Sequence, residues 1–410
     1  AGVAGIIKSA LSLYHKVLPP TLKADEPDPD LGIKESPFYL NSETRPWILR
    51  NGHPRRSGVS AFGFGGSNFH AILEEYQPEK KRVSWEGSVE IFAFSGTTRK
   101  TLQKRIGDAQ KRIQDGKPVA WVAGRSRKEF SEKVSHRLLL RLDLSGTPNM
   151  DRKASDLFAK AEQLISETGT KQPAGTRDIF YSGGKKPERI AFIFPGQGSQ
   201  YVGMGKDLVC LFPEALSVFE KADKAGNGKR HISEYVYPLP DYSGGTKDSR
   251  ESDLRSTDIA QPAIGAVNLA LLKVLARFGI KPDAVCGHSF GELTALCAAG
   301  WIDTDTVLKL AVHRGQYMAL SGKDISGAML AVSAPLAELE SIANEISPDA
   351  VLSNRNSPTQ GVLSGTTEAV AAAEEKCRRL GFRTKRLPVS TAFHTRYMES
   401  AKAPFEQLLK

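Results

Sequence analysis

The sequence is poor in cysteine, with only Cys210, Cys286, Cys297 and Cys377, and no two of them form a C-x-x-C pair. This argues against a disulfide framework and against a zinc site, so we expect no bound metal. The sequence also lacks a glycine-rich nucleotide-binding motif, and we therefore expect no bound cofactor. It has no apolar run close to the roughly 20 residues that span a membrane, and residues 1–18 lack the pattern of a signal peptide. These absences indicate a cytoplasmic protein that does not enter a membrane.

The chain has 410 residues, of which 40% are hydrophobic, and a net charge of +10. This length allows two or three domains with packed cores. The excess charge is confined to residues 79–186, which hold 23 Lys plus Arg against 13 Asp plus Glu, while the remainder holds 33 of each. We do not expect nucleic-acid binding, because this segment shows neither interleaved aromatics nor a known motif. A docking surface for an acidic protein and a solvated face without a partner both remain open.

The motif GHSFG at residues 287–291 is the strongest chemical signal in the chain. It follows a short apolar run at 284–286 and precedes a helical pattern at 292–299. A G-x-S-x-G between a strand and a helix is typical of a nucleophile elbow, in which small neighbours allow a strained turn that exposes the serine hydroxyl. The same five letters also occur in ordinary loops, so the motif depends on this context. Ser289 is the predicted nucleophile.

Three further features of the sequence bear on the role of this serine. Residues 190–194 form an apolar run, predicted to be a buried strand, and the glycine-rich turn PGQGSQ follows at 195–200. Arg314 lies on the predicted helix 307–320. His394 ends the segment STAFH.

Taken together, these motifs resemble those of the malonyl-CoA:acyl-carrier-protein acyltransferase family. Five of them occur in the family's order within residues 189–410: FPGQGSQ at 194–200, GHSFGE at 287–292, the segment 314–318, NSPTQGVLSG at 356–365 and AFH at 392–394. The resemblance implies that His394 removes the proton of Ser289. It also implies that the backbone N–H groups of Gln197 and Phe290 form the oxyanion hole. We expect the group that orients His394 to lie after residue 410, where the acyltransferase part would be truncated.

Arg314 would distinguish a malonyl transferase from an esterase. A guanidinium matches a free carboxylate with two parallel donors, whereas a neutral acyl group offers it nothing. The alternative is a surface arginine in a helix salt bridge. The bulky Phe393 resembles the residue of malonyl-selective members, and Met318, one turn after Arg314, would face the same pocket. For Met318, a core role as a gap-filling side chain is an equal alternative.

The start of the chain resembles a different family. The segment RRSGVSAFGFGGSNFHAILEEY at 55–76 is similar to the C-terminal end of a β-ketoacyl synthase, and residues 1–15 resemble the helix after that family's second catalytic histidine. His15, His53 and His70 do not match its catalytic positions, and no cysteine falls in this part. We therefore expect residues 1–76 to be a thiolase-like fragment, beginning within its domain, that cannot catalyse condensation.

The expected fold class is α/β, with three parts. Residues 77–188 form an α+β linker domain with strands at 89–95 and 135–142, helices at 98–114 and 154–167, and a polar connector at 169–186. Residues 189–410 form an α/β-hydrolase-like core that carries the helix 260–277. Six predicted elements at about 325–389 read strand, helix, strand, strand, helix, strand, the order of a ferredoxin-like subdomain.

The resemblance implies a fragment of a multidomain polyketide or fatty acid synthase, including the polyunsaturated type. Its expected substrate is malonyl-CoA, and the acceptor is the phosphopantetheine thiol of an acyl carrier protein. Other domains of the parent, expected to be a homodimer, would be further partners. Three alternatives remain: a serine thioesterase or esterase, an inactive structural or carrier-docking fragment, and a segment that recruits acidic partners through its linker alone.

Overall fold

In a computed structural model, the described part of the chain comprises residues 1–24, 27–49, 52–84, 87–145, 149–167, 174–184, 189–226, 231–240, 247–322, 326–387, 389 and 391–410. The chain divides into two compact units. The larger unit joins Ala1–Ser84 to Arg189–Lys410, and the smaller unit is Trp85–Glu188. The predicted boundaries at 76/77 and 188/189 stay a prediction.

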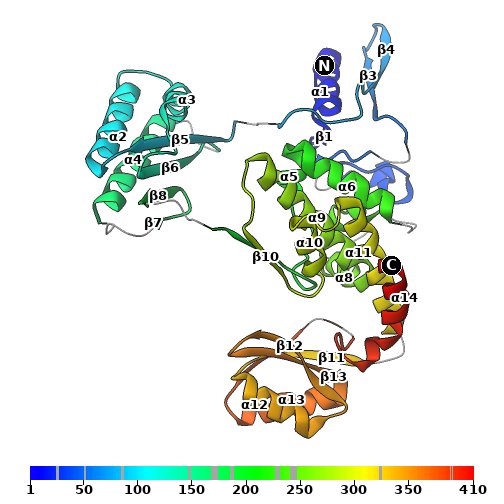
Figure 1. The fold of residues 1–410 in the computed structure, drawn as a ribbon. Coiled ribbons are helices and arrows are strands. Elements are labelled where there is room, and N and C mark those ends of the chain that lie inside the picture. Colours follow the sequence, from blue (N-terminus) through cyan, green and yellow to red (C-terminus); the bar gives the residue numbers. More distant parts are fainter. Residues whose placement is uncertain are drawn as a thin grey trace. The chain divides into compact units, whose positions relative to one another are not determined.

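The smaller unit is an antiparallel sheet covered by helices (Figure 1). The strand order is β5 (Val89–Gly96), β6 (His136–Asp143), β8 (Ile179–Gly183) and β7 (Ala174–Gly175). Three helices accompany the sheet: α2 (Arg99–Gln114), α3 (Val119–Glu129) and α4 (Met150–Glu167). Alternate residues of β5 and β6 pack against one face of each helix, because strand side chains alternate and helical ones repeat every three to four positions. The predicted α+β module is present.

The expected connector at 169–186 differs from the structure. Residues 168–173 and 185–188 lie outside the described part, but β7 and β8 fall within the range. Ile179 and Tyr181 on β8 are almost fully buried in the core of the smaller unit. The prediction was wrong because the polar composition of this stretch concealed a period-two apolar pair. Helix α3 was not predicted either.

The larger unit contains a pair of parallel strands, β9 (Ala191–Phe194) and β10 (Ala284–Gly287). Its core cluster is mostly helical, with residues from α6 (Pro213–Ala225), α9 (Thr257–Arg277) and α11 (Thr304–Ser321). Further helices in this unit are α5 (Lys206–Leu211), α7 (Ile232–Val236), α8 (Lys247–Arg255), α10 (Gly291–Ala298) and α14 (Glu399–Leu409). The α/β class is confirmed.

Strand β9 is less buried than the sequence predicts. Phe194 is 6% exposed, but Ile193 is 77% exposed. In the described residues β9 pairs only with β10, and Ala191 and Ile193, which share one face of the strand, are both exposed. The short apolar run correctly indicated a strand and wrongly indicated burial on both faces.

Helix α9 is the one helix of the described residues that is long and apolar enough to cross a bilayer. The apolar window is 61% buried in the protein, and Ala263, Ile264 and Leu269 belong to the core of the larger unit. A core helix and a membrane span share this composition.

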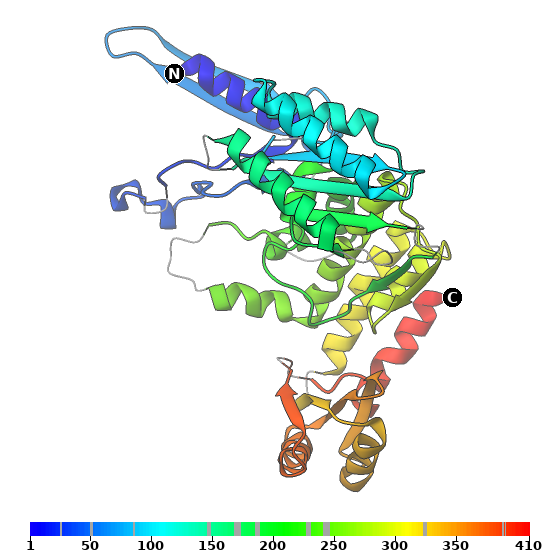
Figure 2. The same cartoon turned by 90° about the vertical axis from the view of Figure 1, so that its left-hand side faces the viewer.

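The inserted subdomain contains six elements in the predicted order: β11 (Gly327–Ser333), α12 (Leu336–Ile346), β12 (Ala350–Ser357), β13 (Gln360–Thr366), α13 (Thr367–Arg379) and β14 (Arg383–Arg386). The strands form an antiparallel sheet in the order β12-β13-β11-β14. Helices α12 and α13 lie side by side on one face of the sheet (Figures 1 and 2). This β-α-β-β-α-β arrangement is ferredoxin-like.

The N-terminal segment of the larger unit contains α1 (Gly2–His15), β1 (Val17–Leu18), β2 (Arg45–Pro46) and the hairpin β3 (Arg56–Phe62) and β4 (Asn68–Glu74), with short 3-10 turns at Pro29–Leu31 and Ile33–Glu35. A buried ionic cluster, which we call the anchor network, joins this segment to α6. Glu75 accepts from Lys16 Nζ at 2.6 Å and from Arg55 Nη1 at 2.8 Å, and Arg55 also pairs with Glu220. Buried charges need such partners, so the network fixes the segment on the core.

Candidate active site

Ser289 occupies the turn between β10 and α10 with a backbone φ of 51°, in the left-handed region that non-glycine residues rarely adopt. The two glycines of the motif explain how the turn fits. A Cβ atom on Gly287 would lie 2.3 Å from the backbone N of Glu292, and one on Gly291 would lie 2.1 Å from the carbonyl O of Phe194. Only glycine therefore allows this close packing, and the predicted elbow geometry is present.

His394 follows the inserted subdomain in the chain and contacts Ser289. Its Nε2 lies 2.8 Å from Oγ of Ser289, although 105 residues separate the two. His394 also has a left-handed backbone, with φ 59°. With the proton on Nδ1, Nε2 accepts from the serine hydroxyl, the arrangement that a general base requires.

The surroundings of His394 favour its neutral form. The pKa of His394 is lowered from its ordinary value, first because the protein removes part of the hydration of the ring, and then because of the positive charge of Arg314 and the proximity of His288. A neutral imidazole at neutral pH can accept the serine proton.

The predicted oxyanion-hole residues lie next to the elbow. A Cβ atom on Gly196 would lie 2.3 Å from the carbonyl O of His288 and 3.4 Å from the N of Phe290, so the loop after β9 packs directly on the elbow. The side chain of Gln197 donates to Oγ1 of Thr257 at 3.1 Å. Across the described ranges, the backbone N–H groups of Gln197 and Phe290 donate to no protein acceptor. Both are free to bind a developing oxyanion.

Arg314 lies on α11 beside the nucleophile. Its Nη2 is 3.4 Å from Oγ of Ser289, and its Nη1 donates to Oε1 of Gln261 at 2.7 Å. Burial lowers the pKa of Arg314, and Glu292 offsets this in part. Arg314 forms no ion pair with any residue that the structure describes, which differs from the alternative of a surface salt bridge.

Met318 and Phe393 meet in a small apolar cluster beside Arg314. They are 8% and 7% exposed, and the cluster also contains Met329, Val362 and Ala401. The Sδ of Met318 accepts from Nε2 of Gln261 at 3.3 Å. Met318 therefore packs in a core and also contacts the hydrogen-bond partner of Arg314, so both of its predicted roles remain open.

Two residues that contact the predicted site residues or the elbow were not predicted from the sequence. Gln261 is fully buried within the apolar helix α9, and a polar side chain in such a helix was the available signal. His288 bonds through Nε2 to Oδ1 of Asn356 at 3.1 Å, which links the elbow to β12 of the inserted subdomain. Asn356 begins the motif NSPTQGVLSG, but its partner could not be read from spacing.

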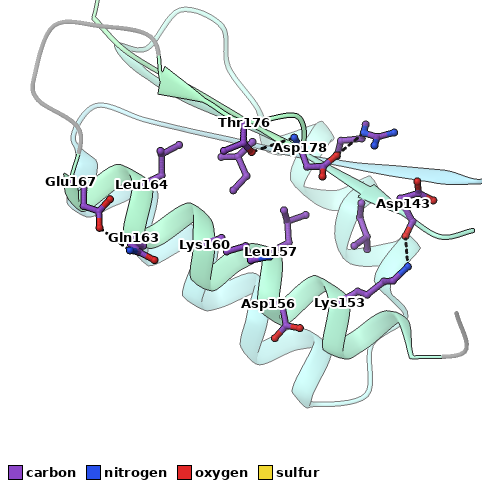
Figure 3. A pocket seen from close by; sticks show the side chains of 13 residues that line it. Asp143, Lys153, Asp156, Leu157, Lys160, Gln163, Leu164, Glu167, Thr176 and Asp178 are labelled. Carbon is purple, nitrogen blue, oxygen red and sulfur yellow. Dashed lines mark hydrogen bonds and ion pairs between the residues drawn. The ribbon is translucent and has the colours of Figure 1, made fainter.

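A separate cavity of about 600 Å³ lies in the smaller unit between α4 and the sheet (Figure 3). Several of its polar groups bond to one another: Arg141 Nε pairs with Asp178 at 2.9 Å, and Lys153 Nζ donates to the carbonyl of Asp143 at 3.2 Å. Its described lining residues include no serine, cysteine or histidine. The candidate active site is therefore the one around Ser289.

Comparison with known families agrees with this geometry. Residues 191–410, more than half of the chain, match the family described as "Acyl transferase domain". Residues 27–138 match the family described as "Ketoacyl-synthetase C-terminal extension". The second match crosses the predicted boundary at residue 76.

Two similar proteins are large synthases. The chain is 32% identical over 439 residues to a polyunsaturated fatty acid synthase chain of Thraustochytrium sp., a match that covers 100% of this chain and 15% of that protein. It is 34% identical over 409 residues to mycoketide-CoA synthase of Mycobacterium tuberculosis, covering 97% of this chain and 9% of that protein. The chain thus spans 15% or less of the length of either relative.

Solved structures share the fold. The acyl transferase domain of ZmaA superposes with a TM-score of 0.62 at 24% identity, covering 79% of this chain and 69% of that one. The acyltransferase domain from module 8 of the salinomycin polyketide synthase gives 0.62 at 22% identity, covering 78% and 71%. With the matched residues and the geometry around Ser289, the chain belongs to the acyl transferase domain family.

Proposed function

We propose that this chain transfers a malonyl group from coenzyme A to the phosphopantetheine thiol of an acyl carrier protein, through an ester on Ser289. The observation that carries the proposal is Arg314: a cation 3.4 Å from the nucleophile whose partner is a neutral amide. A partly desolvated guanidinium without a carboxylate is costly to maintain. A substrate that carries its own carboxylate relieves that cost and is oriented by two parallel donors.

In the first half-reaction, Oγ of Ser289 attacks the thioester carbonyl while its proton moves to Nε2 of His394. The carbonyl oxygen becomes an oxyanion, which the N–H groups of Gln197 and Phe290 stabilise. The tetrahedral adduct collapses with cleavage of the C–S bond, and His394 returns the proton to the departing coenzyme A thiol. The product is a malonyl ester of Ser289.

The second half-reaction reverses these steps with a different thiol. His394 takes the proton of the phosphopantetheine thiol, and the sulfur attacks the ester carbonyl. Cleavage of the C–O bond restores Ser289 after His394 protonates its Oγ. Each half-reaction exchanges one acyl bond for another, so no metal, reductant or nucleotide is required.

The acceptor we infer is an acidic carrier protein, and the smaller unit offers a surface of matching charge. At the corner between α2 and α3, the cations Lys117 and Arg125 flank the ring of Trp121, at 6.0 and 5.6 Å from its centroid. Trp121 is 46% exposed. With Lys111 and Arg112 at the end of α2, these residues form what we call the basic corner. An exposed tryptophan among cations is typical of a binding hot spot.

We place this activity in the cytoplasm, within a parent protein that is a multidomain polyketide or fatty acid synthase and forms a homodimer. The identity to the polyunsaturated fatty acid synthase and the ketoacyl-synthetase match support that setting. A thioesterase would use the same Ser289 and His394 but would have no use for an Arg314 that is held by a neutral amide. A purely structural segment would not need the strained backbone at Ser289.

The test is the intact mass of the protein after mixing with malonyl-CoA, with Ser289→Ala in parallel. A malonyl adduct of about 86 Da on the unaltered chain alone, followed by its loss to an added carrier protein, is the expected result for an acyl-serine intermediate. Loss of the adduct to water at the same rate with and without carrier would identify a thioesterase. Absence of both adduct and coenzyme A release would identify a structural segment.

A further inference from the structure

The side chain of Gln261 links the two features that would select the acyl group. It is fully buried on α9, it accepts from Nη1 of Arg314 at 2.7 Å, and it donates to Sδ of Met318 at 3.3 Å. One amide therefore contacts both the cation and the apolar wall beside it.

The backbone around Gln261 is arranged to permit this contact. A Cβ atom on Gly315 would lie 2.8 Å from the carbonyl O of Thr257 and 2.9 Å from Cα of Asp258. Glycine next to Arg314 thus lets α11 lie against the first turn of α9. Thr257 also holds Gln197 through its hydroxyl. The start of α9 therefore contacts both the loop that carries Gln197 and the helix that carries Arg314.

The chemical character of Gln261 matters as much as its position. A carboxylate at this site would form a paired, charge-assisted bond with Arg314 and neutralise it. An amide oxygen orients the guanidinium through one hydrogen bond and leaves its charge uncompensated. The acid whose charge acts on Arg314 is Glu292, which forms no ion pair with it in the described residues.

We infer that Gln261 is a selectivity-determining positioning residue, whose neutral amide holds Arg314 toward Ser289 while keeping the guanidinium charge available for a substrate carboxylate. The inference rests on the proposed function, since it assumes an acyl group that carries a carboxylate. It extends that function by assigning the preference for charged over neutral acyl groups to a pair of residues.

The test compares Gln261→Glu with Gln261→Met in single-turnover acylation of the full chain by malonyl-CoA and by acetyl-CoA. Both substitutions nearly preserve side-chain length, but only glutamate adds a competing charge. For Gln261→Glu we expect the second-order rate constant of acylation by malonyl-CoA to fall about 100-fold, mainly through weaker binding of the thioester, because a charge-assisted bond to Arg314 must be displaced. Acetyl-CoA should change less than about threefold, since it has no carboxylate to compete for the guanidinium. For Gln261→Met we expect a smaller decrease in the rate constant with malonyl-CoA, about tenfold, because Arg314 loses its orienting hydrogen bond but gains no competing charge.

Asn268→Asp is the matched control, since it adds a buried carboxylate to the same helix, seven residues on, where the side chain contacts Pro195 O instead of Arg314. It can lower acylation by both thioesters, but the ratio of malonyl to acetyl should stay as in the unaltered chain. The inference would be overturned if Gln261→Glu retained the malonyl preference of the unaltered chain. It would also be overturned if Gln261→Met and Asn268→Asp lost that preference as fully as Gln261→Glu. If the unaltered chain itself forms the adduct without preferring malonyl-CoA, the proposed substrate is wrong. Thermal unfolding of each variant confirms that the comparison concerns folded protein.

Discussion

The hydroxyl of Ser289 lies 2.8 Å from Nε2 of His394, and both residues have a left-handed backbone. Such conformations cost on the order of 1 kcal/mol or more each, so the surrounding structure must hold them in place. The pair is thus preorganised before any substrate binds.

The pH dependence of acylation should report the environment of His394. Because its pKa is lowered from 6.5, the neutral base persists below that pH. The acylation rate should rise with pH through a midpoint on the acid side of 6.5 and then level off. In Arg314→Gln the midpoint should move upward, because the nearby positive charge is removed. Rates of coenzyme A release across the acidic and neutral range measure both; an unmoved midpoint would mean that Arg314 does not act on His394.

Removal of Arg314 should change the choice of acyl group more than the rate of the chemistry. In Arg314→Ala we expect acylation by malonyl-CoA to fall about 100-fold, from the loss of a charge-assisted bidentate contact, while acylation by acetyl-CoA is kept or increased. Competition between the two thioesters, read by adduct mass, gives the ratio directly. Equal losses with both thioesters would contradict a carboxylate-binding role.

The substitution Gly315→Ala should destabilise the larger unit. The added Cβ would press on Thr257 O at 2.8 Å, and such overpacking costs about 1–3 kcal/mol in unfolding free energy. The same change should slow acylation, since Arg314 would move with α11. Gly107→Ala is the control: this glycine lies within α2 and a Cβ there meets nothing within 4 Å, so the variant should be more stable by about 0.5–1 kcal/mol. Calorimetry of the two variants should show melting shifts of opposite sign.

The anchor network should be sensitive to loss of its one shared carboxylate. Glu75→Gln leaves Lys16 and Arg55 buried with reduced compensation, which should cost about 3–5 kcal/mol in unfolding free energy. The preceding residue, Glu74, forms an exposed ion pair with Arg56. Glu74→Gln should therefore cost under about 1 kcal/mol in unfolding free energy. Denaturant titration of both variants tests the contrast, and similar midpoints would show that the network contributes little.

Charge reversal at the basic corner should slow delivery to a carrier protein without affecting acylation by coenzyme A. In a triple variant, Lys111, Arg112 and Lys117 each replaced by Glu, we expect transfer from the acyl-enzyme to fall about tenfold at low salt, because electrostatic steering is reversed. The difference should diminish at high salt. Stopped-flow transfer to an acidic carrier protein provides the rate.

An equal charge change elsewhere on the smaller unit serves as the control for that variant. Lys133, Arg152 and Lys160 are exposed and lie outside the corner. If their replacement by Glu slows transfer as much, the effect is one of net charge, and the basic corner is not a docking surface.

Much of this site could be predicted from the sequence, because its chemistry depends on local signals. The glycines around Ser289 mark the elbow, and the order of elements at 325–389 correctly gave the subdomain inserted before His394. The buried polar character of Gln261 was the one signal in the sequence, and its two contacts could not be predicted, since the partners lie 53 and 57 residues later on another helix. The same limit applies to β8, whose buried Ile179 and Tyr181 are defined by pairing with β6 across a polar sequence.

The insertion between the two reactive residues also bears on how the protein is made. A ribosome completes Ser289 well before His394, with all of the inserted subdomain translated in between. A nascent or interrupted chain therefore has the serine without its base, and an alkyl hydroxyl alone is a poor nucleophile at neutral pH. Under the proposed function, we therefore expect an incomplete copy to leave thioesters intact, because Ser289 reacts with them only after the subdomain has folded and His394 has reached it.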